Sequence, residues 1–561
     1  MRIVATFALL LIATLSERAA ERVAAGEPVA PIRGSLVICG GGELPARVID
    51  EFIKLAGGEK ARLVVIPTAS ERADLLAADV RRTDEFLKLW RDKKPADVAL
   101  LHARSREEAN QEAFVKPLRD ATAVWISGGS QQHLADAYLD TAVVRELRAL
   151  LERGGVIGGT SAGAAILSDP MIAGDPPQGA ATPKITRGFG LFPGGLIDQH
   201  FTERNRRPRL EAAVAELAKS GNPRFGLGID ERAAVVAQGR ELRVIGDNTV
   251  FALLPKSATR PAAVVRLREH MRDDLVALHR ATSDRAASAR AGESFPPAIS
   301  VRPVVPHGTL VIVGGGGMPK PILDRFLEAA GGKEAKIVVV PTVADPATFA
   351  GETRMFTKAG CTNVVVLAPK NRDEANSPEM LAKLRDARGV WFGGGRQWRF
   401  VDSFEATKCY DAFHDVLRRG GVIGGSSAGA TIQGDYLCRG SPIVNTIMMA
   451  EGYERGFAFL PGTAIDQHFT QRKRQPDMES LKQAFPQLLG LGIDEATALV
   501  VTGTTAEVVG SHTASFYPPL DPKSDDDASS EVPTPIVLKD GESFDLRTNR
   551  PLEKRPAAAT P

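Results

Sequence analysis

An internal duplication is the sequence feature that most limits how this chain can fold. Residues 154–164 read GGVIGGTSAGA and residues 420–430 read GGVIGGSSAGA. Two further blocks recur in the same order: LIDQHFTERNRRP at 196–208 with AIDQHFTQRKRQP at 464–476, and GLGIDE at 226–231 and 490–495. The offset between the two copies stays between 264 and 268 residues. A period this long indicates two whole domains rather than a solenoid of short repeats.

Each half alternates apolar runs with amphipathic stretches, which is typical of an α/β domain. The strands expected in the first half are Leu36–Cys39, Leu63–Pro67, Val98–Leu101, Val124–Ser127 and Val156–Gly158. Between them, 79–91 and 143–153 carry apolar residues at helical spacing. Continuous apolar strands separated by helices predict a mostly parallel sheet flanked by helices. The predicted organisation is a first domain at 26–280, a linker at 281–306, a second domain at 307–549 and a disordered tail at 550–561, with a second polar and mobile segment at 523–531.

The N-terminus has the pattern of a secretory signal. Arg2 is followed by an apolar run over 3–15, and small residues at 23–25 suit cleavage before Gly26. A run of about 13 residues is shorter than the ~20 that a membrane-spanning helix needs. We therefore expect residues 1–25 to be a signal peptide and the mature protein to be secreted or periplasmic, without a membrane anchor. An uncleaved anchor is the alternative.

Composition excludes several other classes of protein. The 70 Lys and Arg residues nearly balance the 68 Asp and Glu residues, giving a net charge of +2, so no polybasic surface for nucleic acid is expected. The four cysteines lack CxxC spacing and paired Cys/His clusters: Cys39, Cys361, Cys409 and Cys438. They predict free buried thiols, with neither a disulfide framework nor a metal site.

A candidate nucleophile lies just after GGVIGG in each copy of the first repeated block. Ser161 and Ser427 are the central residues of G-x-S-x-G sequences that follow an apolar strand and precede a helix-compatible segment. This is the context of a nucleophile elbow, in which a tight strand-to-helix turn presents the hydroxyl. The Gly40–Gly42 stretch could instead suggest a dinucleotide turn. It lacks the G-x-G-x-x-G spacing because Pro45 occupies the last position, so a structural turn near the active edge is expected.

A hydroxyl nucleophile needs a base and an acid that orients the base. Of nine histidines, only His200 and His468 occupy matching positions in the two halves. Glu231 and Glu495 are the matched candidates for the acid. Two further pairs, Asp230 with Asp494 and Asp198 with Asp466, are matched as well and remain alternatives. The order Ser, His, Glu differs from the Ser, Asp, His order of α/β-hydrolases and argues against an ordinary esterase or lipase.

Arginines and glutamines near these motifs suggest the kind of substrate. Arg204 and Arg206 follow His200, and Arg472 and Arg474 follow His468. Guanidinium groups bind carboxylates bidentately, which points to an anionic substrate, although a solvated basic face would have the same sequence. Two glutamines in Gly-rich turns after a strand either bind substrate amides or tie down the loop: Gln131 and Gln397.

These motifs together resemble the cyanophycinase family of serine peptidases. The segments that carry the resemblance are GTSAGA at 159–164, Gly-Gly-x-Gln at 128–131, DQHFTERNRRPRL at 198–210 and GIDE at 228–231. The resemblance covers 34–280 and 308–548 and implies two tandem domains of the class I glutamine-amidotransferase-like α/β fold. The family cleaves cyanophycin, a poly-aspartate with arginine on its β-carboxyls, into β-Asp-Arg dipeptides. For this chain we expect amide hydrolysis that uses no metal or organic cofactor.

The resemblance also implies a role for individual residues. Ser161 is the nucleophile, His200 the base and Glu231 its orienter, with Ser427, His468 and Glu495 in the second half. The substrate pocket is expected from Gln131, Asp198, Gln199, Arg204, Arg206 and Arg209, and from Gln397, Asp466, Gln467, Arg472 and Arg474. Backbone N–H groups at Gly129 and Ala162, with Gly395 and Ala428 in the second half, are the expected oxyanion donors.

The second half departs from this pattern at one position, because Asp477 stands where the first half has Arg209. If Arg209 holds a substrate carboxylate, the second site should bind the same polymer less well or prefer another substrate. The expected partner is a peptide or cyanophycin-like polymer, and the two halves are expected to pair as an internal pseudo-dimer. The alternatives are an exopeptidase on other aspartyl or β-aspartyl peptides and a non-catalytic binding protein of the same fold.

Overall fold

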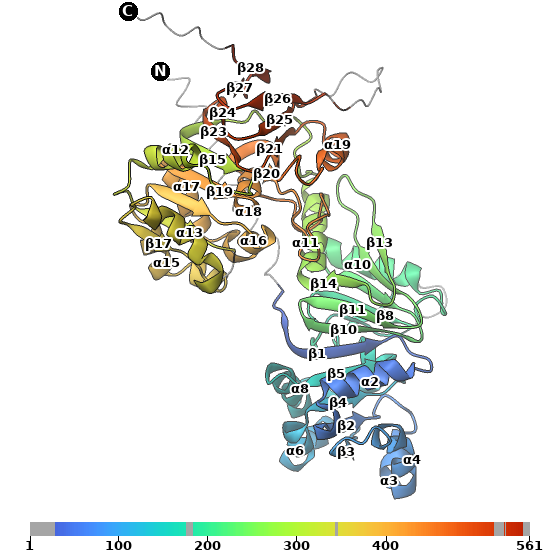
Figure 1. The fold of residues 1–561 in the computed structure, drawn as a ribbon. Coiled ribbons are helices and arrows are strands. Elements are labelled where there is room, and N and C mark those ends of the chain that lie inside the picture. Colours follow the sequence, from blue (N-terminus) through green and yellow to red (C-terminus); the bar gives the residue numbers. More distant parts are fainter. Residues whose placement is uncertain (1–28, 175–182, 343–345, 521–531, 533, 554–561) are drawn as a thin grey trace, which may run out of the picture. The chain divides into compact units, whose positions relative to one another are not determined.

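The computed structural model describes residues 29–174, 183–342, 346–520, 532 and 534–553. The predicted signal peptide and the polar segment 523–531 therefore lie outside the described residues. Contacts divide the described chain after Glu293 into two domains, coloured from blue to green and from yellow-green to red in Figure 1. Among the described residues, no helix has both the length and the apolar character needed to span a membrane.

The first domain is built around a sheet of eight strands. In spatial order the strands are β14 (Arg272–Asp274), β11 (Glu241–Gly246), β10 (Ala233–Gly239), β1 (Ile32–Cys39), β5 (Val156–Thr160), β4 (Ala123–Ile126), β2 (Arg62–Ile66) and β3 (Asp97–Leu100). The run from β1 to β3 is parallel, and β10, β11 and β14 add an antiparallel edge. The five strands predicted from apolar runs are thus confirmed as the parallel part of this sheet.

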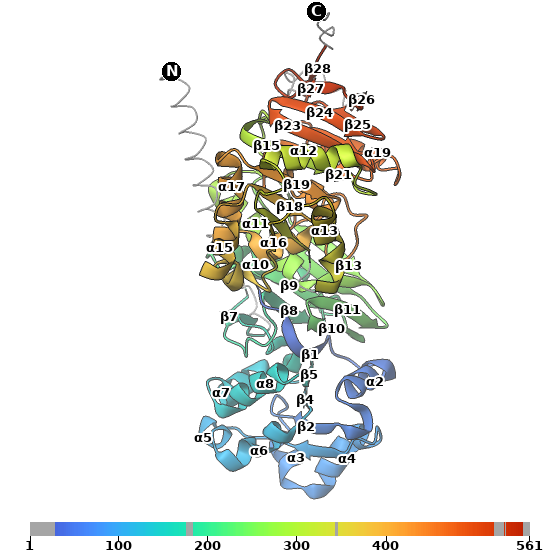
Figure 2. The same ribbon diagram turned by 60° about the vertical axis from the view of Figure 1, so that its left-hand side comes forward.

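Both faces of the sheet are covered, which explains why its strands are apolar at successive positions. On β1, Leu36 and Ile38 belong to one buried cluster, whereas Val37 and Cys39 belong to another. The helices are α2 (Ala46–Leu55), α3 (Ala73–Ala78), α4 (Val80–Arg91), α5 (Arg106–Ala109), α6 (Glu112–Asp120), α7 (Gln131–Tyr138) and α8 (Ala142–Glu152), with a short 3₁₀ turn at Gly58–Lys60. Figure 2 shows α7 and α8 on one side of β4 and β5 and α2 on the other.

A second, smaller sheet carries the other half of the candidate site. Its strands, in spatial order, are β13 (Ala263–Leu267), β12 (Val250–Leu254), β9 (Phe225–Ile229) and β8 (Gly195–Gln199). The remaining elements are β6 (Met171–Ile172), paired with β7 (Ile185–Thr186), and the helices α9 (Ala162–Ala165), α10 (Arg207–Lys219) and α11 (Leu275–Ala291). Because β8 and β9 are parallel, the residues that follow their carboxyl ends meet at one edge.

The second domain repeats this design. Its nine-stranded sheet runs β17 (Val364–Val366), β16 (Ile337–Val340), β18 (Gly389–Phe392), β19 (Val422–Ser426), β15 (Val305–Val313), β23 (Thr497–Gly503), β24 (Thr505–Gly510), β27 (Ser543–Asp545) and β28 (Arg550–Pro551). Its five-stranded sheet runs β20 (Gly434–Tyr436), β21 (Leu460–Gln467), β22 (Leu489–Ile493), β25 (Thr513–Tyr517) and β26 (Ile536–Lys539). The helices are α12 (Lys320–Ala330), α13 (Pro346–Lys358), α14 (Arg372–Ala375), α15 (Pro378–Leu384), α16 (Trp398–Phe404), α17 (Lys408–Arg418), α18 (Ala428–Thr431) and α19 (Gln475–Ala484).

Two predicted boundaries are wrong. Residues 281–291, predicted as the start of the linker, form the larger, C-terminal part of α11, where Ala281, Thr282 and Ala286 are buried. Their Ala- and Ser-rich composition suggested a linker, but small side chains also allow a helix to pack closely against its neighbours. Residues 550 and 551, predicted as part of the tail, pair with β27 as β28. All four cysteines are buried and unpaired, as the sequence predicts.

Candidate active site

Each candidate nucleophile occupies a strained turn between a strand and a short helix. Ser161 lies between β5 and α9 with φ 55° and ψ −116°, and Ser427 lies between β19 and α18 with φ 56° and ψ −111°. L-residues rarely adopt such a positive φ, which is a mark of functional turns. The flanking glycine is required sterically, because a Cβ at Gly159 would lie 2.1 Å from the Gly163 carbonyl oxygen. These features match the nucleophile elbow predicted from the sequence.

A hydrogen-bonded chain of serine, histidine and glutamate is present in both domains. In the first, Ser161 Oγ lies 2.7 Å from His200 Nε2, and His200 Nδ1 lies 2.6 Å from Glu231 Oε1. In the second domain, the distance from serine Oγ to histidine Nε2 is 2.9 Å and that from histidine Nδ1 to glutamate Oε1 is 2.6 Å. The serine comes from the large sheet, whereas the histidine and the glutamate follow neighbouring strands of the smaller sheet. The site is therefore assembled where the two sheets of a domain meet.

The structure distinguishes among the three acids that the sequence left open. Glu231 contacts the imidazole directly, whereas Asp230 Oδ1 accepts the backbone N–H of Thr202 at 2.9 Å. Asp198 is fully buried and is bound by arginine. The second domain has the same arrangement, with Asp494 Oδ1 accepting the Thr470 N–H at 2.9 Å. Only the glutamate of GLGIDE is placed to orient the histidine.

The glycine turn after β1 packs closely against the imidazole of His200 and the carboxylate of Glu231. A Cβ at Gly41 would lie 2.3 Å from His200 Cε1, and a Cβ at Gly42 would lie 2.8 Å from Glu231 Oε2. Both glycines have positive φ, at 112° and 67°. The Gly40 carbonyl accepts the His200 N–H at 2.8 Å. The prediction of a structural turn near the active edge is confirmed, and the absence of side chains there is what admits the ring.

A second glycine loop lies beside the nucleophile. A Cβ at Gly128 would lie 3.7 Å from Ser161 Oγ, and the expected oxyanion donor Gly129 is the next residue, with φ 142°. The other expected donor, Ala162, is the first residue of α9, and the first N–H groups of a helix have no acceptor within it. The loop and the helix end thus flank the hydroxyl, an arrangement that suits stabilisation of an oxyanion.

Comparison with known proteins places the chain in a family. The sequence profile of peptidase family S51 matches residues 36–245 and again residues 310–509. The chain belongs to peptidase family S51. It is 32% identical over 229 residues to a cyanophycinase of Geminocystis herdmanii (strain PCC 6308), covering 39% of this chain and 80% of that one. It is 31% identical over 261 residues to a cyanophycinase of Synechococcus elongatus, covering 43% and 78%.

Solved structures give a more distant likeness. A peptidase from an acI-B1 Actinobacterium is 22% identical in sequence, with a TM-score of 0.35, over 44% of this chain and 98% of its own. Family membership makes this protein a serine-type peptidase. Both of its S51 regions contain the serine, histidine and glutamate described above.

The arginines after each histidine are not equivalent to one another. Arg204 is exposed; burial lowers the pKa of His200, and the charge of Arg204 adds to this lowering. Arg206 is buried and donates from Nη1 to the Gln199 backbone oxygen and Oε1, both at 2.8 Å. The second S51 region has the same division, with one exposed and one buried arginine: Arg472 and Arg474. Only the exposed member of each pair is therefore placed to meet a substrate from solvent.

Arg209 does not have the place expected for it. Its Nε and Nη2 donate to the two oxygens of Asp198 at 2.8 and 2.5 Å, and its Nη1 donates to the Gly174 carbonyl at 3.1 Å. Only 9% of this side chain is exposed. Arg209 thus supports the pocket from within, which corrects the expectation that it grips a substrate carboxylate. Sequence position alone could not reveal that the nearest carboxylate is the protein's own.

The paired glutamines tie down the segment that follows the elbow. Gln131 Nε2 donates to the Ile172 carbonyl at 3.0 Å, and Gln397 Nε2 donates to the carbonyls of Cys438 and Arg439, both at 2.7 Å. Of the two readings left open by the sequence, the structure favours loop anchoring. Gln467 is buried beside the second site, and its Oε1 has no hydrogen-bond partner among the described residues.

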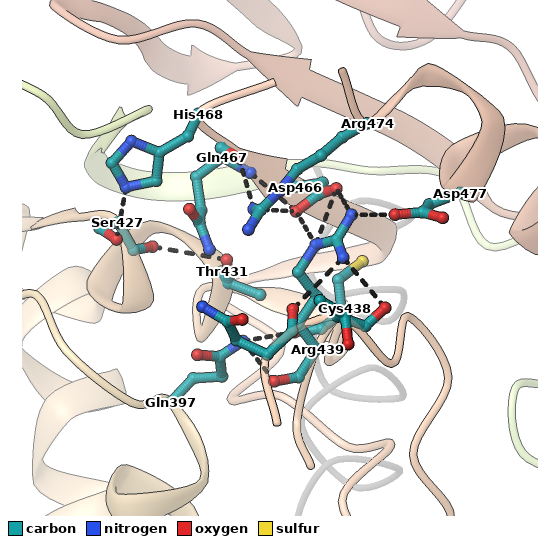
Figure 3. A network of polar contacts seen from close by, with 12 residues as sticks. Gln397, Ser427, Thr431, Cys438, Arg439, Asp466, Gln467, His468, Arg474 and Asp477 are labelled. Carbon is teal, nitrogen blue, oxygen red and sulfur yellow. Dashed lines mark hydrogen bonds and ion pairs between the residues drawn. The ribbon is translucent and has the colours of Figure 1, made fainter. Parts of the chain in front are cut away.

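Two residues of the second domain were missed by sequence reasoning. Arg439 lies in the segment after the elbow, where the two halves diverge, so no matched position marked it; Figure 3 shows it at the centre of a polar network beside Ser427 and His468. Glu352 lies on α13 outside every motif. Its Oε1 accepts the Gly394 N–H at 3.0 Å, and its Oε2 is buried without a partner among the described residues. The interior next to the second glycine loop thus contains a carboxyl group that no sequence signal predicted.

The histidines should give the activity an acid limit below pH 6.5. Burial lowers the pKa of His200 and of His468 below the ordinary value of 6.5, although the hydrogen bonds that the imidazoles donate to Glu231 and Glu495 act to raise it. The neutral imidazole, which is the form able to accept the serine proton, is therefore present at neutral pH. We expect kcat/KM for each site to be constant near pH 7 and to fall on acidification with a midpoint below 6.5. A midpoint above 6.5 in a pH profile of kcat/KM would contradict this assignment.

Glu352 should make the stability of the second domain depend on pH. Burial raises its pKa from 4.5 to about 7, so the folded domain holds this proton more tightly than the unfolded chain does. The stability associated with protonated Glu352 is present below about pH 4.5 and is lost as pH rises through 7. Glu352→Gln should therefore raise the unfolding free energy of this domain at pH 8 by about 1–3 kcal/mol and have little effect at pH 4. Denaturant unfolding at both pH values tests this, with exposed Glu379→Gln as control. An equal effect at both pH values would rule out the ionisation as its cause.

Proposed function

We propose that this protein is a cyanophycin-degrading peptidase with two Ser–His–Glu sites, and that it releases β-Asp-Arg dipeptides. The observation that carries the proposal is the serine–histidine–glutamate chain, present with the same connectivity in both S51 regions. The similarity to cyanophycinases supports the choice of polymer. The exposed arginine beyond each histidine supports an anionic substrate, because a guanidinium binds a carboxylate as a fork.

The geometry suits acyl transfer in two steps. His200 accepts the Ser161 proton as Oγ attacks an aspartyl carbonyl carbon, and the tetrahedral oxyanion forms between the Gly129 loop and the first N–H of α9. Collapse of this intermediate breaks the C–N bond, and the imidazolium gives its proton to the leaving amine. Water then attacks the acyl-enzyme with His200 as base, and Ser161 recovers its proton. Glu231 holds the ring and stabilises the imidazolium throughout.

The test is incubation with cyanophycin, followed by mass spectrometry of the soluble products. Release of β-Asp-Arg supports the proposal. A folded protein that releases nothing, but whose serines react with a fluorophosphonate, would exclude this polymer and leave the peptidase site intact.

Another acidic peptide is the second candidate substrate. Arg206 and Arg209 are bound within the protein, so fewer arginines face solvent than the cyanophycinase resemblance implied. This observation favours a substrate that presents a single carboxylate near Arg204. A panel of aspartyl and β-aspartyl dipeptides run beside cyanophycin distinguishes the two.

We also propose that the protein is exported, on the pattern of residues 2–25. Cell fractionation with N-terminal sequencing of the mature protein tests this. Retention of residues 1–25 in the mature protein would contradict cleavage.

A further inference from the structure

A buried aspartate two residues before each histidine is held by an arginine, but the arginine comes from a different segment in each domain. Asp198 and Asp466 are both fully buried. In the first domain the bidentate partner is Arg209, the third residue of α10, and Arg206 Nη1 lies farther away, 3.7 Å from Asp198 Oδ1. The third donor of Arg209 binds the Gly174 carbonyl, just beyond β6. A single guanidinium thus joins the end of β8, the start of α10 and the segment that follows the elbow.

In the second domain the arginine that binds the buried aspartate comes from the segment after the elbow instead of from the helix. The residue in the position of Arg209 is Asp477, whereas Arg439 belongs to the segment after the elbow. Arg439 Nε lies 3.0 Å from Asp466 Oδ1, and its Nη2 lies 2.9 Å from Asp466 Oδ2 (Figure 3). The same Nη2 lies 2.6 Å from Asp477 Oδ2 in the first turn of α19. The charge reversal at position 477 therefore accompanies an arginine that has moved to the facing segment.

Arg439 also organises its own segment. Its Nη1 donates to the backbone oxygens of Asn445 and Thr446 at 3.3 and 3.4 Å, and only 3% of its side chain is exposed. The carbonyl of Arg439 accepts from Gln397, two residues beyond the expected oxyanion donor Gly395. The residue therefore links three parts of the second site: the histidine strand, the start of α19 and the loop beside the nucleophile.

We propose that Arg439 is the positioning residue of the second site and does there what Arg209 does in the first. This inference rests on the proposed function of the Ser427 site. Asp466 and His468 are separated only by Gln467, whose N–H donates to Asp466 Oδ1 at 3.0 Å. A shift of the carboxylate is therefore passed along the backbone to the imidazole. The second site therefore keeps an arginine on its buried aspartate. Asp477 binds that arginine, so its negative charge does not indicate a lost pocket.

Removal of Arg439 should lower turnover more than substrate binding. Asp466 would keep Arg474, 2.9 Å from Oδ1, but would lose its bidentate partner, and an incompletely paired buried carboxylate is unstable. Movement of a reacting group by about 1 Å can cost about 10²-fold in rate. In a Ser161→Ala background, where only the second site operates, we expect Arg439→Ala to lower kcat about 100-fold with a smaller change in KM.

The first domain supplies the rescue variant. Arg439→Ala combined with Asp477→Arg recreates the arrangement of Asp198 and Arg209, and it should recover kcat to within about 10-fold of the parent. Glu479→Ala is the control, since it removes an exposed carboxylate from the same helix without touching Arg439 or Asp466 and should change kcat little. Fluorophosphonate labelling of Ser427 should follow the same order, and this readout does not depend on the choice of substrate.

Each outcome decides for or against the proposal. Unchanged kcat and labelling in Arg439→Ala would overturn it, as would a folded double variant that recovers neither. Loss of folding in the double variant would overturn it too, because Arg439 would then serve the stability of the domain instead of the site. If the parent does not cleave cyanophycin, but labelling of Ser427 still falls in Arg439→Ala and recovers in the double variant, the positioning role is supported and the proposed substrate is rejected.

Discussion

Replacement of both Ser161 and Ser427 by alanine is expected to lower peptide release by at least about 10⁴-fold, because no hydroxyl then remains to form the acyl-enzyme. Each single variant should keep the activity of the other domain, since each domain contains its own serine, histidine and glutamate. Mass spectrometry of the released products measures the effect, and circular dichroism checks the fold. Serine to alanine removes a single oxygen, so the elbow should persist.

The chain itself supplies the matched control. The residue before the nucleophile is Thr160 in the first domain and Ser426 in the second. Thr160→Ser and Ser426→Thr exchange this one residue between the two elbows and should leave both activities near their original values. Complete loss of release in Ser161→Ala alone would contradict an active second site. Full retention in the double alanine variant would refute the nucleophile assignment itself.

Replacement of Glu231 by glutamine is expected to lower kcat of the first site by about 10²–10⁴-fold. Glu231 Oε1 lies 2.6 Å from His200 Nδ1, so the carboxylate holds the tautomer that leaves Nε2 free to accept the serine proton. A glutamine can present its NH₂ group to Nδ1, which favours the wrong tautomer and does not stabilise an imidazolium. The measurement is kcat in a Ser427→Ala background, with Glu495→Gln in a Ser161→Ala background for the second site.

The neighbouring aspartate provides the comparison. Asp230→Asn keeps an oxygen for the Thr202 N–H and does not touch the imidazole. It should therefore lower kcat by less than about 10-fold. An equal loss of kcat in Glu231→Gln and Asp230→Asn would show that both carboxylates act through the turn after His200. Glu231 would then not be the residue that orients the imidazole.

Much of the site was predictable because the chain contains two copies of it. Matching positions singled out two of nine histidines, and the G-x-S-x-G context located both elbows. The parallel strands were predicted because burial on both faces makes their sequences continuously apolar. Matching could not choose among Glu231, Asp230 and Asp198, since all three recur. Only the geometry separated the acid on the imidazole from the one bonded to Thr202 and the one held by Arg209.

Matching failed where a function moved between segments. Arg209 and Asp477 occupy the same sequence position with opposite charges, which suggested a weakened second pocket. The structure shows the guanidinium arriving from residue 439 instead. An ion pair is set by where two charged ends meet in space, and long side chains can reach the same carboxylate from either flank.

The sequence by itself determined the duplication, the elbows, the histidines and the parallel strands, because these depend on local spacing and on burial patterns written into each segment. Tertiary structure decided which carboxylate meets the imidazole, which arginines remain exposed and which segment supplies the arginine that binds the buried aspartate. Those outcomes depend on distances between residues far apart in the chain. The second sheet brings the residues after β8 and β9 to the elbow of the first, and no local pattern encodes that meeting.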